Sequence, residues 1–397
     1  MNTPLYIAKR YLFSKTANAT INIITKIATV GVIIGTMALF IVLSVFSGLK
    51  SFNLFFLNTA DPDIKITSTK GKSFMITDDI NTTLKDKRIT TFSKIIEEHA
   101  LLNFEGKQKA ATIKGVDINY LKVNKMDTAV VIGEWLTPKE RNGVIIGRGI
   151  SRKLALPLYS FTDNLKIFVM KPGKGQLGMN SSNSVNTQVK GIFELVENID
   201  KKFVFTNLEL AQELLNYQKN QISAIEILLN NVKNHKSFAK ELQKKLGASF
   251  KVQTRHQLNE LTYKMLNMEN LFTYLISTLI VIIALFNVIG AMIMMILDKR
   301  DNLKTLFNLG LTIKEIRHIF TLQGFLLSVF GLVVGLILAS IIVFIQKIYE
   351  PIMIRPDLAY PVEFHWENLL VVVATILVLG IIAALIASSR INKKLIE

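Results

Sequence analysis

Four apolar stretches, almost free of charged side chains, dominate the hydrophobic pattern of the chain. A helix needs roughly 20 residues, at about 1.5 Å of rise per residue, to cross a bilayer core about 30 Å thick. Each stretch is at least this long, and each must be helical because lipid offers no partner for a free backbone amide. We therefore predict transmembrane helices over residues 23–49, 270–297, 318–346 and 368–389.

Residues 50–269, between the first and second spans, follow a different pattern of short segments in which apolar and polar positions alternate. This alternation is typical of β-strands, and the Glu105-Gly106 pair between two of them predicts a hairpin turn. The predicted strands are 63–67, 100–104, 110–115, 143–147, 166–170, 189–195, 224–229 and 250–254. The predicted fold is an α-helical membrane protein with four transmembrane helices plus a large mixed α/β domain inserted between the first and second spans.

Helical patterns interrupt these strands. The strand at Gly143 turns into a helix near Gly147-Arg-Gly149, a glycine pair that could hold an anion but is more often only a turn. Thr206 is placed to cap a helix that runs to Asn216. Residues 234–246 predict a helix between two strands, and a further helix from Gln257 is expected to run unbroken into the second span.

The loop between the second and third spans, residues 298–317, carries its own helical pattern. Its apolar side chains Leu303, Leu306 and Phe307 share one face at helical spacing. Asp301 or Asn302 can cap this helix at its start. We predict a small amphipathic helix over 302–309, lying along the membrane surface.

The end of this short helix and the start of the third span also have sequence signals. Gly310 is placed to end the helix, because glycine enters the left-handed conformation without steric cost. Thr312 and Glu315 have the spacing of a capping box, which predicts a new helix that continues into the membrane.

Basic residues flank three of the connecting segments and set the predicted orientation. Lys and Arg are frequent in residues 1–22, in the 298–317 loop and in the 390–397 tail, whereas the 347–367 loop is mainly acidic. By the positive-inside rule, both termini and the 298–317 loop are cytoplasmic, and 50–269 and 347–367 lie outside. Residues 1–22 are cationic with apolar residues at helical spacing, which predicts an interfacial helix on the cytoplasmic surface.

Composition narrows the chemistry. The chain has a formal net charge of +17 and a mean hydropathy of +0.36, which is high for a soluble protein. A basic domain beside a membrane could attract anionic headgroups or acidic partners, although a generally basic proteome with a solvated, charged surface is the favoured explanation. Nucleic-acid binding is not expected, because no recognised motif accompanies the charge. There are no cysteines, which excludes disulfides and thiolate sites.

An enzymatic site is not predicted. Gly71-Lys72-Ser73 imitates the end of a phosphate-binding loop, but Ile66 stands where that motif needs its first glycine. No metalloprotease or nucleophile-elbow motif is present, so we predict no catalytic and no metal-ligating residues. Within the spans, Gly31 and Gly35 could seat a neighbouring helix closely, and Asn287 is expected to form a hydrogen bond between helices.

Several segments resemble the permease family that includes Lol-type lipoprotein-releasing subunits, MacB-type exporters and FtsX-type division proteins. The matching segments are YIAKRYL at 6–12, IIGTMA at 33–38, VLSVFSG at 42–48, IKGVD at 113–117, VIIGRG at 144–149, VEFHW at 362–366 and LKTLFNLG at 303–310. The last of these departs from the usual family signature at Phe307, and Asn302 just before it stands where an acidic residue is common. The resemblance covers most of the chain and is closest to the lipoprotein-releasing branch.

The resemblance implies a complex in the bacterial inner membrane. It implies two permease subunits, identical or homologous, and two separate cytoplasmic ATPase subunits that bind ATP and Mg while this chain binds no cofactor. It also implies release of lipoproteins from the outer leaflet of the inner membrane to a periplasmic carrier. The alternative is a MacB-like or FtsX-like protein that exports another substrate or relays a signal to cell-wall enzymes.

Candidate sites follow from this resemblance and from the patterns above. ATPase coupling is assigned to the 302–309 helix and its flanks, through Leu303, Leu306, Phe307, Gly310, Thr312 and Glu315. A substrate cavity between the first and second spans is assigned to Leu43, Phe46, Met268 and Phe272, for which ordinary helix packing is the alternative. The loop 171–188 is a candidate docking site for the carrier, with Leu177 and Met179 at its tip.

Overall fold

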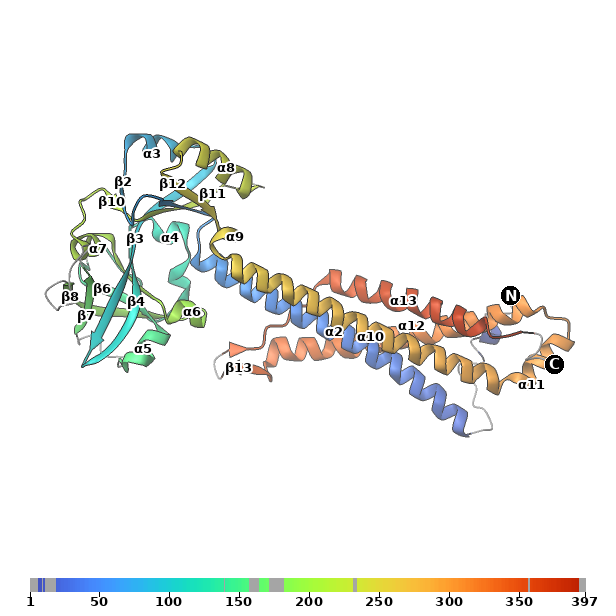
Figure 1. Cartoon of the computed structure of the whole chain (residues 1–397). Helices are drawn as coiled ribbons and strands as arrows, with labels where there is room; N and C mark the ends of the chain where they lie inside the picture. Colours follow the sequence, from blue (N-terminus) through green and yellow to red (C-terminus); the bar gives the residue numbers. More distant parts are fainter. Residues whose placement is uncertain are drawn as a thin grey trace. The chain divides into compact units, whose positions relative to one another are not determined.

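The computed structural model describes residues 6–8, 10, 19–138, 140–156, 164–170, 182–230, 234–355 and 358–392. The chain divides into two compact units (Figure 1). The helical unit comprises Met1–Phe52 and Lys264–Glu397, and the sheet unit comprises Asn53–Tyr263. Two helices, α2 (Ala19–Ala60) and α10 (Glu260–Asp298), contribute residues to both units.

Four helices are long and apolar enough to cross a membrane, as the hydrophobic pattern predicts. After α2 and α10, the helical unit contains α11 (Arg300–Asn308), α12 (Ile313–Tyr349), β13 (Met353–Arg355), β14 (Leu358–Ala359) and α13 (Trp366–Ser388). The first helix extends eleven residues past the predicted end of its span at Leu49. No proline interrupts the chain there before Pro62, so the helix continues to Ala60.

Small residues bring α12 close to two neighbouring helices. A Cβ atom at Gly331 would lie 2.5 Å from a methyl group of Val32 on α2. A Cβ atom at Gly324 would lie 2.7 Å from Ala384 on α13. Glycines at such contacts let helix backbones approach closely in lipid, where van der Waals packing holds helices together. The buried core of this unit accordingly draws on α2, α10, α12 and α13.

The sheet unit is built on ten strands that pair in one sheet. They are β1 (Ile64–Ser68), β3 (Ile89–Phe104), β4 (Lys107–Val116), β5 (Val130–Gly133), β6 (Gly143–Gly147), β7 (Asn164–Met170), β8 (Ser182–Phe193), β9 (Phe203–Asn207), β11 (Ala224–Leu229) and β12 (Phe250–Thr254). The pairings close a ring of β3, β4, β9, β6, β8 and β7, and β7 pairs again with β3. Closing a sheet in this way removes exposed strand edges.

Short helices and one small strand pair complete this unit. The strand pair is β2 (Phe74–Met75) with β10 (Gln221–Ile222). The helices are α3 (Asp78–Thr83), α4 (Tyr120–Val123), the 3-10 helix η1 (Met126–Ala129), α5 (Arg148–Leu154), α6 (Glu197–Asp200), α7 (Leu208–Leu215), α8 (His235–Leu246) and α9 (Arg255–Leu258). One apolar cluster joins the strands of the ring to α5 and α7, and another lies between α8 and the strands β1, β11 and β12.

Several local predictions are confirmed. The β3–β4 hairpin turns at Glu105 and Gly106, both of which have positive φ, as a two-residue turn between twisted strands requires. The predicted helix over residues 234–246 is present as α8, and Asn234 caps it by accepting a hydrogen bond from the Ser237 amide. The strand–helix–strand order of β11, α8 and β12 is also present, with β1 inserted between the two strands.

Three local predictions are wrong in detail. Asn207, not Thr206, stands at the start of α7, because the Thr206 hydroxyl donates to the Gly143 carbonyl on β6 instead. The helix expected to run unbroken from Gln257 is interrupted at Asn259, which lies between α9 and α10 and hydrogen-bonds to Asp61. The predicted loop 171–188 is shorter, because β8 begins at Ser182 and pairs with β7.

Candidate functional site

The connection between α10 and α12 contains the short helix that the sequence predicts, with a different start. The residue before the first turn of α11 is Lys299, and no side chain caps it, so neither Asp301 nor Asn302 is the cap. Asp301 instead lies in the first turn, where a negative charge is favoured by the exposed backbone amides of the helix end.

The end of α11 is fixed by backbone geometry. Gly310 has φ +97°, its amide donates to the Phe307 carbonyl at 3.0 Å, and the Leu311 amide donates to the Leu306 carbonyl at 3.2 Å. These two bonds form a Schellman motif, which satisfies the last carbonyls of the helix and turns the chain sharply. A Cβ at Gly310 would meet no atom within 4 Å, so the glycine is required by its backbone angle alone.

The capping box at the start of α12 is confirmed. The Thr312 hydroxyl accepts a hydrogen bond from the Glu315 amide at 3.3 Å, and the Glu315 carboxylate accepts from the Thr312 amide at 2.8 Å. Further along this helix, the Arg317 guanidinium donates twice to the Ile391 carbonyl, at 2.9 and 2.7 Å. The start of α12 is therefore tied to the chain that leaves α13.

Burial on α11 corrects the predicted apolar face. Leu303 is fully buried and belongs to the core of the helical unit, and Phe307 packs against the same core. Leu306 is half-buried, and the most exposed apolar side chain here is Leu309, at 73%. The predicted face thus attaches α11 to its own bundle, and what α11 presents outward is mainly polar, together with Leu309.

The helices α2 and α10 pack closely at mid-length, as the Gly31 and Gly35 pair predicts. A Cβ at Gly31 would lie 2.9 Å from the Asn287 amide nitrogen, and one at Gly35 would lie 3.1 Å from Ala284. Asn287 is exposed, and within the described residues it makes no hydrogen bond to another helix. Its amide instead lies against Gly31, which differs from the predicted interhelical bond.

The four predicted cavity residues differ in exposure. Met268 and Phe272 on α10 are 57% and 54% exposed, whereas Leu43 packs against the core of the bundle and Phe46 is half-buried. Ordinary helix packing therefore accounts for Leu43, and the two α10 residues are the ones left open to a ligand.

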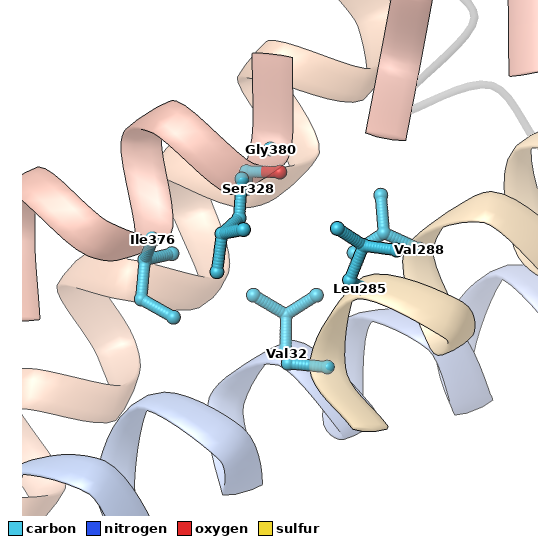
Figure 2. A pocket seen from close by; sticks show the side chains of 8 residues that line it. Val32, Leu285, Val288, Ser328, Ile376 and Gly380 are labelled. Carbon is cyan, nitrogen blue, oxygen red and sulfur yellow. The ribbon is translucent and has the colours of Figure 1, made fainter. Parts of the chain in front are cut away.

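A small apolar pocket lies deeper, among all four long helices (Figure 2). Its lining is apolar apart from one hydroxyl, and consists of Val32, Ala284, Leu285, Val288, Ser328, Ile376, Leu379 and Gly380. The Ser328 hydroxyl donates to the Gly324 carbonyl of its own helix at 2.9 Å. The pocket consequently offers no free hydrogen-bond donor and suits only apolar groups.

A contact that the sequence did not indicate holds residues 44–48 of α2. Residues 361–368, here called the strap, cross the last turns of α2 in the helical unit. The Glu363 amide donates to the Ser44 carbonyl at 3.2 Å, and Asn368 donates to Ser47 at 2.9 Å. A Cβ at Gly48 would lie 2.5 Å from the Pro361 carbonyl oxygen. The strap includes the VEFHW segment, whose role could not be read from the sequence because its partners lie about 320 positions away.

The sequence patterns also did not indicate a buried ion network in the sheet unit. Lys65 on β1 lies opposite Glu226 on β11, and Glu97 on β3 lies opposite Lys114 on β4. The Lys114 amine is 2.7 Å from Glu226 and 3.4 Å from Glu97, and Lys65 is 2.8 Å from Glu97. The available signal was a charged residue at an inward position of an otherwise apolar strand, as in the segment AIEILL of β11.

The charges of this network are set by its own members. Burial opposes the charged form of Lys114, but Glu226, Tyr120 and Glu97 together outweigh it and raise the pKa of Lys114 well above its ordinary value. Burial would likewise raise the pKa of Glu97, but Lys65 and Lys114 outweigh it and lower that pKa to about 2. Both groups are therefore charged at neutral pH and hold four strands together.

Two sequence candidates remain, the glycine pair near Gly147 and the tip of the 171–188 loop. Gly147, at the turn from β6 into α5, packs against the Asp200 backbone and leaves no room for a Cβ, so the glycine serves packing, and Arg148 pairs with Glu194. Leu177 and Met179 lie outside the described residues. Within the described ranges, no group of three or more His, Asp and Glu side chains is placed to hold a metal ion.

Two family models match the chain. The model of the MacB-like periplasmic core domain matches residues 25–245, and that of the FtsX-like permease C-terminal region matches residues 274–396. The chain belongs to the MacB- and FtsX-like permease family. The predicted resemblance is thereby confirmed, and the four apolar helices are those of a membrane protein of this family.

Individual relatives match over almost the whole chain. The lipoprotein-releasing system transmembrane protein LolE of Haemophilus influenzae is 24% identical over 99% of this chain and 98% of its own length. LolC of Buchnera aphidicola subsp. Schizaphis graminum is also 24% identical, over 97% of this chain and 96% of its own length. Because the two identities are equal, they do not assign the chain to the LolE or the LolC type.

Two solved structures match about half of this chain. The periplasmic region of MacB from Actinobacillus actinomycetemcomitans matches 50% of this chain and 92% of that chain, at 12% identity and a TM-score of 0.35. The extracellular domain of the transporter YknZ from Gram-positive bacteria matches 48% and 99%, at 14% identity and a TM-score of 0.35.

Proposed function

We propose that this chain is the permease subunit of an ATP-driven transporter that releases lipoproteins from the outer leaflet of the bacterial inner membrane to a periplasmic carrier. The observation that carries the proposal is similarity to LolE and LolC over nearly the full length of this chain and of each relative, together with the matches to the MacB-like and FtsX-like models. Both termini and α11 lie in the cytoplasm, and the sheet unit lies in the periplasm.

The energy for release comes from two separate ATPase subunits, which bind ATP and Mg. The element of this chain that contacts them is α11, with its flanks. Burial of Leu303 fixes one side of α11 to the bundle, the Schellman motif and the capping box fix its connection to α12, and the exposed side with Leu309 is left for a partner. A push on that side is transmitted to the bundle as a rigid-body movement.

The lipid-modified substrate reaches the transporter sideways from the membrane, on the side of α10. Met268 and Phe272 are the side chains of the predicted cavity that remain exposed, and they contact the acyl chains. A second permease subunit, of the same or a homologous sequence, covers the other side of this cavity. The 171–188 segment, with Leu177 and Met179, is the proposed carrier contact.

The second candidate function is an FtsX-like relay to cell-wall enzymes or a MacB-like exporter of another substrate. The family match itself favours it, because both domain models carry those names. Copurification of an ATPase agrees with every one of these functions and cannot separate them.

Depletion of the chain in its host separates them. Fractionation of inner and outer membranes should show lipoproteins, normally in the outer membrane, accumulating in the inner membrane before growth stops. Normal lipoprotein distribution, together with defective cell-wall cleavage or retention of another substrate, would overturn the proposal in favour of the second candidate.

A further inference from the structure

The connection between α12 and α13 exposes an unusual amount of apolar surface for a short hairpin. Its strands β13 and β14 pair through Met353 with Ala359 and through Arg355 with Leu358. Ile352, Met353 and Ile354 are 63%, 50% and 45% exposed. Surrounded by water, these three side chains would cost free energy at roughly 25 cal/mol per Å² of apolar surface.

The base of the hairpin cannot fold back to bury them. The side chain of Gln346, which is buried at the end of α12, donates to the carbonyls of Ile352 at 2.8 Å and Tyr360 at 3.2 Å. The Gln346 side-chain oxygen accepts from the Ile352 amide at 3.1 Å. The Tyr360 amide donates to the Ile352 carbonyl at 2.9 Å. One glutamine therefore fixes the direction in which the hairpin leaves the helix.

The surroundings of the hairpin match the chemistry of a membrane surface. The charge-free run of α12 ends at Lys347, only a few residues before the first strand, so the hairpin begins where the bilayer core ends. Tyr349 and Trp366, at the facing ends of α12 and α13, are 77% and 65% exposed. Tyr and Trp prefer the level of the lipid headgroups.

We propose that this hairpin, here called the lipid platform (Ile352–Arg355 with Leu358 and Ala359), rests in the headgroup layer of the leaflet at the α12 end opposite α11. Met353 and Ile354 reach the boundary of the acyl chains. The occupant is the lipid surface itself, because the platform continues directly from a membrane-spanning helix. This binding surface lies beyond the transport function and does not depend on it.

A consequence concerns α2. The connection continues from the platform through Tyr360 into the strap. The strap contacts Ser44, Ser47 and Gly48 in the last turns of α2 that belong to the helical unit. Lipid contact at the platform thereby anchors α2, whereas the corresponding end of α10 has exposed side chains such as Leu271 and Tyr274.

The absence of cysteine from the chain makes a direct test simple, since every introduced cysteine is the only one. Met353→Cys and Ile354→Cys are labelled with an environment-sensitive fluorophore, and the full chain is reconstituted in vesicles of phosphatidylcholine and phosphatidylglycerol. Val333→Cys, half-exposed in the middle of α12, is the reference for a bilayer position. Lys107→Cys, exposed at the start of β4, is the reference for water.

The platform labels should be blue-shifted relative to Lys107→Cys and quenched by spin-labelled lipids. A spin label near the headgroups should quench them more than one near the bilayer centre, with the opposite order at Val333→Cys. Emission and quenching like those of Lys107→Cys at both positions would overturn the proposal. Blue-shifted emission without lipid quenching would also overturn it, because it would assign the cover to protein, such as a second copy of the chain.

Discussion

Lys114 shows how strongly one residue can depend on its partners. Its side chain is 6% exposed and that of Glu226 is 1% exposed, at 2.7 Å from each other. A buried ion pair adds little stability compared with an apolar pair of the same size, but removing one partner leaves an uncompensated buried charge. The complete network therefore adds little to the total stability of the fold, but losing one of its members is costly.

We predict that Lys114→Met lowers the free energy of unfolding by about 3–5 kcal/mol, because it leaves Glu226 buried without its closest cation. Urea unfolding of the full chain in detergent, followed by the fluorescence of Trp135 in the sheet unit, measures this. The double variant Lys114→Met with Glu226→Leu should recover most of the loss. Equal destabilisation by the single and double variants would show that the pair's charges are not what matters.

Glu97 gives the same network a pH dependence. Its pKa is lowered from 4.5 to about 2, so the folded state binds its proton less readily than the unfolded chain does. Its contribution to stability is full above pH 4.5 and is lost as the pH falls from about 4.5 towards 2. The midpoint of unfolding should fall across this window, and Glu97→Gln should make the midpoint less dependent on pH there. An unchanged slope in Glu97→Gln would contradict the assignment.

At the scale of elements, the short helix α11 combines two roles on two faces. Leu303 and Phe307 attach it to the bundle, and the turn at Gly310 sets its angle to α12. The exposed side, with Leu309, is the part that another protein can reach. Substitutions on the two faces should therefore have different consequences.

We predict that Leu309→Asp and Leu306→Asp weaken association with the ATPase by roughly tenfold or more, since a contact loss of about 1.4 kcal/mol is tenfold in affinity. Both variants should still fold and bind lipoprotein. Leu303→Asp, by contrast, should destabilise the helical unit itself, because it buries a charge. Affinity of the purified ATPase for the reconstituted variants measures the first effect, with Leu306→Met as the conservative control. If both aspartate variants keep full ATPase binding and lipoprotein-stimulated hydrolysis, α11 is not the coupling element.

Elements with local signals were the predictable ones. The Glu105-Gly106 turn, the 234–246 helix, the Gly310 turn and the Thr312 capping box each depend on the chemistry of a few neighbouring residues, and each is present. The burial of Leu303, the strap on α2 and the closed ring of strands depend on residues far apart in the chain. Hydrophobic periodicity identified the apolar face of α11 but could not say whether its own bundle or a partner covers it.

At the scale of the whole molecule, the helical unit has two kinds of surface on its long helices. Around α12, glycine contacts and the strap bind α2 and α13 tightly. Along the first half of α10, most apolar side chains are exposed, with Leu266 as a buried exception. Under the proposed function, this exposed part of α10 is the surface that a lipid-modified substrate meets.

We predict that photocrosslinkers at Met268 and Phe272 capture lipoprotein in the absence of ATP, and that capture falls when ATP drives release. Crosslinkers at Leu43, which packs against the core, should capture much less. Immunoblotting of crosslinked membranes for a model lipoprotein measures this. Capture confined to α12 and α13 positions, with Ile337 as a matched exposed site, would place the cavity elsewhere.

The central claim is that this chain works with an ATPase to move lipoproteins out of the membrane, and reconstitution tests it most directly. Proteoliposomes containing the chain, its copurified ATPase and a labelled triacylated lipoprotein are incubated with the soluble carrier, and lipoprotein in the supernatant is measured. The account predicts release that requires ATP and carrier, and that is lost when the ATPase cannot hydrolyse ATP. An active ATPase that leaves all lipoprotein in the membrane in the presence of carrier would contradict it.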